Sequence, residues 1–158
     1  MKLTVVAVGR MKGAERELCD RYGKRLVASA RQVGLDWRGI AEIGEARAPT
    51  AQARMLLEGG SILARADGGG LIALDERGEA VTSEAFARMI GRDRDEGRAG
   101  LLFAMGGPDG HADAVRSAAQ RVISFGKLTW PHQLARVMLV EQLYRATTIL
   151  AGHPYHRS

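Results

Sequence analysis

The sequence predicts an α/β fold, a single-domain sandwich over residues 1–158 with a mostly parallel sheet. Short apolar stretches bounded by turn residues alternate with longer segments in which apolar residues recur every three or four positions. This alternation is typical of parallel sheets covered by helices. The length suits one domain, and no internal repeat or Pro/Ser-rich linker divides the chain.

Continuous apolar stretches mark the predicted strands. They lie at residues 3–8, 71–74, 101–105 and 122–125, and each is short enough to be a strand buried on both faces. Residues 35–43 alternate imperfectly between apolar and polar side chains, which is compatible with a further strand. We expect loops at residues 68–70 and in the mixed-charge run 92–98.

Helical spacing marks the segments between the strands. Leu18, Tyr22 and Leu26 form one stripe, and residues 50–66 form a second helical run. Ser83 is a candidate N-cap for a helix around residues 86–90, and a short helix is expected near residues 112–119. The longest pattern begins with Pro131 as its first helical residue and ends before Gly152.

The composition excludes several classes of protein. The longest apolar runs fall far short of the ~20 residues of a membrane helix, and residues 1–10 lack the length and cleavage site of a signal peptide. A single cysteine, Cys19, excludes an internal disulfide and fits a cytoplasmic protein without membrane contact. The net charge of +5 permits a polyanionic partner, although many basic proteins bind no nucleic acid.

The carboxyl ends of the predicted strands are the expected ligand-binding positions, as in other open parallel sheets. Those ends are Leu74 with Asp75, Gly106 with Gly107, and Gly126 with Lys127. The paired glycines allow a ligand to approach the backbone closely, but an ordinary strand-to-helix turn has the same composition. The glycine patterns of phosphate loops and dinucleotide sites are absent.

The loop of residues 125–130 and the helix after it carry further polar candidates. Pro131 biases Trp130 towards an extended backbone, which exposes N–H and C=O groups to a ligand. His132 and Arg136 are one helical turn apart and share a helix face. The alternative interpretation is an amphipathic helix with a partly buried tryptophan and no site.

The end of the chain is rich in groups that bind RNA. All four histidines follow residue 110, and the segment from Gly106 onward contains six Lys/Arg and three Asp/Glu. Tyr155, His156 and Arg157 combine an aromatic ring with groups that bind phosphate, although terminal residues are often disordered. His153 and His156 lack the companions of a zinc motif, so no metal is expected.

Four segments carry a family resemblance that covers the whole chain. They are Gly106-Gly107-Pro108-Asp109-Gly110, Leu128-Thr129-Trp130-Pro131-His132-Gln133-Leu134-Ala135-Arg136-Val137, Glu141-Gln142-Leu143-Tyr144-Arg145-Ala146 and His153-Pro154-Tyr155-His156-Arg157. Together they resemble the RlmH family, the bacterial 23S rRNA pseudouridine N3-methyltransferases of the SPOUT superfamily. The resemblance implies a C-terminal trefoil knot, which apolar periodicity does not indicate.

By the same resemblance, the cofactor is S-adenosyl-L-methionine. Its expected contacts are Leu74 and Gly106, together with Phe125, Gly126, Lys127, Leu128, Thr129 and Trp130, and we add Gly107 from the glycine turn. The expected substrate is 23S rRNA within the assembled ribosome, bound by a homodimer. The tail of one subunit is expected to complete the site of the other.

The implied reaction assigns roles to five side chains. Attack by N3 of pseudouridine is helped by removal of its weakly acidic proton, for which His132 and His156 are candidate bases. Arg136 and Arg157 are candidates to stabilise an anion or bind phosphate, and Tyr155 to stack on the base. Two rival interpretations are a ribosome-associated RNA-binding module without catalysis and an NAD-dependent enzyme, whose glycine fingerprint is missing.

Overall fold

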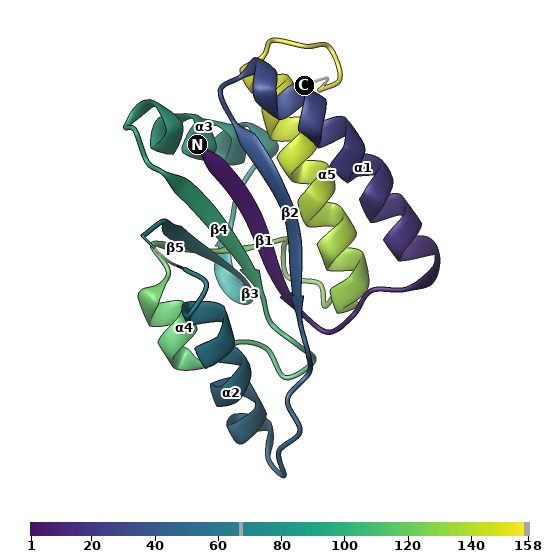
Figure 1. Ribbon diagram of the computed structural model, residues 1–158, viewed down its shortest axis with the longest axis vertical. Helices are drawn as coiled ribbons and strands as arrows, with labels where there is room; N and C mark the ends of the chain where they lie inside the picture. Colours follow the sequence, from purple (N-terminus) through teal and green to yellow (C-terminus); the bar gives the residue numbers. More distant parts are fainter. Residues whose placement is uncertain (67, 157–158) are drawn as a thin grey trace.

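A computed structural model describes residues 1–66 and 68–156, in which strands and helices alternate along the chain (Figure 1). The elements are β1 (Lys2–Val8), α1 (Gly13–Gln32), β2 (Asp36–Ile43), α2 (Ala51–Leu63), β3 (Gly70–Ala80), α3 (Ser83–Asp95), β4 (Gly100–Met105), α4 (Asp113–Ala118), β5 (Arg121–Ser124) and α5 (His132–Leu150).

The strands form one sheet in the order β2-β1-β4-β3-β5, and all four neighbouring pairs are parallel. The predicted α/β class with a mostly parallel sheet is therefore confirmed. The further strand expected at residues 35–43 is also present, as β2 at the edge of the sheet beside β1.

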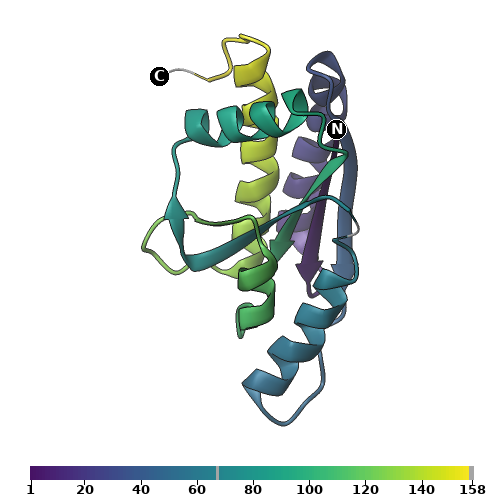
Figure 2. The ribbon, with the colours of Figure 1, turned by 90° about the vertical axis from the view of Figure 1, so that its left-hand side faces the viewer.

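Helices cover both faces of the sheet (Figure 2), which explains the continuous apolar strands. In β1, Leu3 and Val5 pack into the core beneath α1, α3 and α5, whereas Val6 and Val8 pack into the core beneath α2 and α4. None of the helices in the described part of the chain is long and apolar enough to cross a membrane.

Strand β3 is longer than the predicted strand at residues 71–74. The prediction was too short because the second half of β3 is charged and carries no apolar signal. Both Leu74 and Glu79 pair with Ile123 of β5, so residues 75–78 bulge out between two paired stretches. A Cβ atom at Gly78 would lie 2.5 Å from the Ile123 carbonyl carbon, so only glycine fits there. The bulge sets Asp75 and the residues after it beside the ends of β4 and β5.

Three local predictions are wrong. Residues 92–95 are helical, because α3 extends to Asp95 and buries the Asp93 side chain, which accepts hydrogen bonds from Arg98 and Gln120. The N-cap of α3 is Thr82 rather than Ser83, and its hydroxyl accepts from the Ala85 N–H at 3.2 Å. Pro131 is itself the N-cap of α5, one position before the first helical residue.

Candidate functional site

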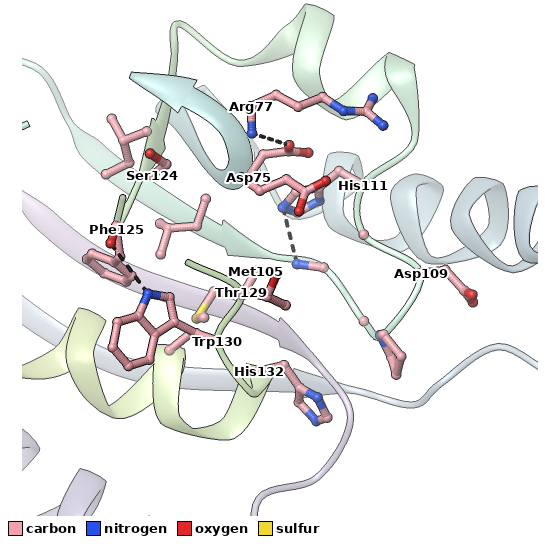
Figure 3. Close-up of a pocket in the computed structure, with 18 of the residues that line it drawn as sticks. Asp75, Arg77, Met105, Asp109, His111, Ser124, Phe125, Thr129, Trp130 and His132 are labelled. Carbon is pink, nitrogen blue, oxygen red and sulfur yellow. Dashed lines mark hydrogen bonds between the residues drawn. The ribbon is translucent and has the colours of Figure 1, made fainter. Parts of the chain in front are cut away.

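A cavity of about 490 Å³ lies beside the bulge of β3 and at the carboxyl ends of β4 and β5 (Figure 3). Its volume falls within the range of small-molecule sites. Three chain segments and the start of α5 form most of its wall. The lining comprises Met55, Leu74, Asp75, Glu76, Arg77, Met105, Gly106, Gly107, Pro108, Asp109, Gly110, His111, Asp113, Arg116, Ile123, Ser124, Phe125, Gly126, Leu128, Thr129, Trp130, His132 and Ala135.

The glycine turn after β4 is closed tightly on itself. The Gly110 N–H donates to the Gly107 carbonyl at 3.0 Å, and Gly110 has a φ of 85°, which favours glycine. A Cβ atom at Gly106 would lie 2.7 Å from the Gly110 carbonyl carbon and oxygen. A side chain at Gly106 would therefore prevent the turn from closing, before it reached any ligand.

His111 lies buried beneath this turn, with an exposed fraction of 3%. Its Nε2 accepts a hydrogen bond from the Gly106 N–H at 3.1 Å (Figure 3). Burial lowers the pKa of the imidazole, against the opposing effect of the Asp75 carboxylate. The ring is therefore neutral, and since Nε2 is the acceptor, the proton is on Nδ1.

Asp75 and Arg116 form an ion pair between the β3 bulge and α4. The Arg116 guanidinium donates to Asp75 Oδ2 at 3.0 Å and to the His111 carbonyl at 2.5 Å, and it also pairs with Asp113. Burial raises the pKa of the Asp75 carboxyl, but the Arg77 N–H and Arg116 outweigh it and lower the pKa overall. An ionised Asp75 paired with Arg116 thus lines the cavity.

The loop between β5 and α5 forms the outer wall. The Trp130 indole N–H lies 3.4 Å from the Phe125 carbonyl, and Gly126 has a φ of 97°. Leu128 is 72% exposed and Trp130 40% exposed, so apolar side chains face solvent at the cavity mouth. Lys127 is exposed and lies outside the lining of the cavity.

The two candidates on α5 have different surroundings. His132 lines the cavity, whereas Arg136 is 1% exposed and lies against the ends of β1 and β2. Arg136 donates to the Val8 carbonyl at 2.9 Å, the Gly9 carbonyl at 3.2 Å and Glu42 at 2.9 Å. Burial lowers the pKa of the guanidinium, and Glu42 opposes that effect. Arg136 therefore joins α5 to the sheet.

The tail folds back along α5, away from the cavity. The Tyr155 hydroxyl donates to Glu141 Oε1 at 3.1 Å, and His156 Nε2 lies 2.5 Å from Glu84 Oε1 at the start of α3. Glu141 follows His132 by nine residues, roughly 14 Å along a helix axis. Arg157, the remaining candidate of the tail, lies outside the described residues.

The structure brings most predicted cofactor contacts together in one cavity and adds polar groups that sequence reasoning missed. Asp75 was expected only as part of a strand end, and His111 and Arg116 were not candidates, although His111 follows the glycine turn. Residues 1–66 and 68–156 hold no group of three or more His, Cys, Asp or Glu side chains placed to bind a metal ion.

Comparison with known families defines the class of protein to which this fold and cavity belong. Residues 1–156 match the family model described as "Predicted SPOUT methyltransferase". The chain belongs to the SPOUT methyltransferase family.

Curated relatives narrow the comparison further. Three proteins named "Ribosomal RNA large subunit methyltransferase H" are similar over their full length and the full length of this chain. They come from Brucella anthropi at 54% identity, Brucella ovis at 53% and Brucella melitensis at 51%.

Solved structures of low sequence identity share the fold. TrmJ from Z. mobilis aligns with a TM-score of 0.51 at 17% identity, over 98% of this chain and 72% of that one. A putative RNA methyltransferase from Bacillus anthracis aligns with a TM-score of 0.50 at 13% identity, over 99% and 98% of the two chains.

Proposed function

We propose that this chain is an S-adenosyl-L-methionine-dependent methyltransferase that modifies N3 of a pseudouridine in 23S rRNA of the assembled ribosome. The observation that carries the proposal is identity of 51–54% over the full length to proteins named "Ribosomal RNA large subunit methyltransferase H". The cavity supports it, because it lies where parallel α/β sheets bind ligands.

The cavity fits the cofactor in size and in chemistry. Its wall offers the backbone of Leu74, of the glycine turn and of the loop after β5 to an adenosine group, and apolar side chains such as Met105 to the rest. Leu74, Gly106, Gly107, Phe125, Gly126, Leu128, Thr129 and Trp130 are therefore the proposed cofactor contacts that line the cavity, with Lys127 beside them.

The residues of this chain contribute mainly by positioning. S-adenosyl-L-methionine, when bound, supplies a methyl group that its sulfonium already activates. His132 lines the cavity at the start of α5, where it is placed to accept the N3 proton of a pseudouridine that enters through the mouth. Exposed Trp130 offers a ring on which a base can stack.

The tail is proposed to act across a homodimer. Within one subunit Tyr155 and His156 are held by Glu141 and Glu84, so they do not line the cavity beside His132. Exposed apolar side chains at Leu18 and Leu134 offer area for a second copy. A partner's tail that reaches the cavity would supply a second candidate base, His156, together with Arg157.

Two further expectations complete the proposal. The C-terminal third is proposed to form the trefoil knot of the family. Unfolding of the chain by single-molecule pulling from both ends tests whether the knot is present. The protein is proposed to act in the cytoplasm, where assembled ribosomes are found.

Mass-spectrometric mapping of rRNA tests the activity directly. Ribosomes from a strain without this protein are incubated with the purified chain and labelled S-adenosyl-L-methionine. We expect one added methyl group at N3 of a pseudouridine in 23S rRNA. Binding to ribosomes without transfer of label would instead support an RNA-binding module without catalysis.

A further inference from the structure

His111 is a buried polar side chain at the cavity wall that the proposed function does not use. Its Nε2 accepts from the Gly106 N–H at 3.1 Å, while Nδ1 is buried and has no hydrogen-bonding partner within residues 1–66 and 68–156. The Gly106 N–H belongs to the turn whose backbone faces the proposed cofactor. One imidazole nitrogen therefore fixes the first residue of that turn.

The hydrogen bond exists only while His111 is neutral. A protonated ring has N–H groups on both nitrogens, so Nε2 would face the Gly106 N–H as a second donor and repel it. The turn has little free space, because even a Cβ atom at Gly106 would lie 2.7 Å from the Gly110 backbone. Protonation would thus displace the turn rather than rotate one side chain.

The charged groups around the ring and its turn come from three other elements. Asp75 of β3 favours protonation, and Arg116 of α4, which donates to the His111 carbonyl, opposes it. On the α2 side, the buried Glu58 carboxylate lies beside Gly107. Burial outweighs Asp75, so the pKa of His111 lies below its ordinary value of 6.5.

We propose that His111 is a positioning residue for cofactor binding: its neutral ring holds the Gly106 N–H and keeps the glycine turn in the geometry that receives the cofactor. This inference rests on the proposed function, since it assumes that the cavity takes S-adenosyl-L-methionine. The bound state requires the neutral ring, so affinity falls as pH drops through the pKa of His111 in the free protein.

Calorimetric titration with S-adenosylhomocysteine between about pH 8 and about pH 5 tests the proposal. In wild type we expect affinity to fall about tenfold for each pH unit below the pKa of His111 in the free protein, as release of one proton requires. His111→Gln keeps an acceptor near the Nε2 position but does not titrate. It should bind within about threefold of wild type at the higher pH and lose most of the pH dependence.

Two further variants separate positioning from other effects. His111→Leu removes the acceptor and should bind weakly at every pH, whereas the matched control His153→Gln, at an exposed histidine, should keep the wild-type profile. A His111→Gln protein with the wild-type pH profile, or a His111→Leu protein with wild-type affinity, overturns the inference.

Nitrogen NMR of the wild-type imidazole gives a readout that needs no variant to fold. We expect Nε2 of His111 to be unprotonated and Nδ1 protonated at neutral pH; the opposite tautomer would overturn the proposal. If wild type binds no S-adenosylhomocysteine at any pH, the proposed function itself fails. Normal binding with a pH dependence that His111→Gln leaves intact refutes only the role of His111.

Discussion

The sequence predicts that residues of the cavity at the start of α5 and residues of the tail beyond its end form one active site. In the structure of one subunit the two regions lie apart. The cavity is lined by the bulge of β3, by the segments that follow β4 and β5, and by His132. The tail is instead held by hydrogen bonds, from Tyr155 to Glu141 of α5 and between His156 and Glu84 of α3. The proposed cofactor contacts and the candidate residues of the tail thus lie in different parts of one subunit.

The electrostatics of the two regions also differ. In the cavity wall His111 is buried and neutral beside the ionised Asp75. At the tail, the pKa of Glu84 is lowered to about 2 by its own N–H, the Thr82 hydroxyl and His156. These interactions stabilise mainly the start of α3, and in part the tail, above the usual pKa of a glutamate, and their stabilisation is lost as pH falls through about 2.

The largest predicted effect distinguishes a structural arginine from a catalytic one beside the cavity. Arg136→Met should lower the free energy of unfolding by about 3–5 kcal/mol, because it leaves Glu42 and the Val8 carbonyl without their buried partner. Urea denaturation measures it. The matched control Arg38→Met removes an exposed pair with Asp36 and should cost under about 1 kcal/mol. Equal stability of both variants would show that Arg136 does not hold α5 to the sheet.

A smaller effect tests whether the glycine turn belongs to the cofactor site. Gly106→Ala places a Cβ atom 2.7 Å from the Gly110 backbone and should weaken S-adenosylhomocysteine binding about 100-fold, or about 2.7 kcal/mol. Gly60→Ala, on the exposed side of α2 with no atom within 4 Å, should bind as wild type does. Calorimetry that finds the two variants equal would remove the turn from the site.

The smallest effect concerns the support of the tail. Thr82→Ala removes the N-cap of α3 and should cost about 1 kcal/mol of stability. Ser83→Ala leaves the cap intact and removes the hydrogen bond that the Ser83 hydroxyl donates to Gln142 of α5 at 2.7 Å. Thermal unfolding compares the two variants. Cofactor affinity should not change in either, since α3 does not line the cavity. A Thr82→Ala protein as stable as wild type would show that Thr82 does not cap α3.

The sequence predicted what depends on apolar patterning and on backbone turns. The buried strands, the parallel sheet and the strand ends that line the cavity follow from continuous apolar runs and paired glycines. The β3 bulge was missed because Gly78 is required by contact with Ile123, a residue distant in sequence. The roles of Arg136 and His111 depend on partners in other elements, Val8 and Gly106, which spacing along one helix or turn does not reveal.

Mixed dimers give the most direct test of the central claim that the cavity of one subunit works with the tail of the other. A Gly106→Ala subunit has a defective cavity and an intact tail, and a His156→Ala subunit has the reverse. Neither homodimer should methylate ribosomes. We predict that co-expressed heterodimers, isolated with two affinity tags, recover about half of wild-type activity, since one composite site is intact. Heterodimers as inactive as both parents would contradict the account, because a tail that serves its own cavity leaves no intact site in them.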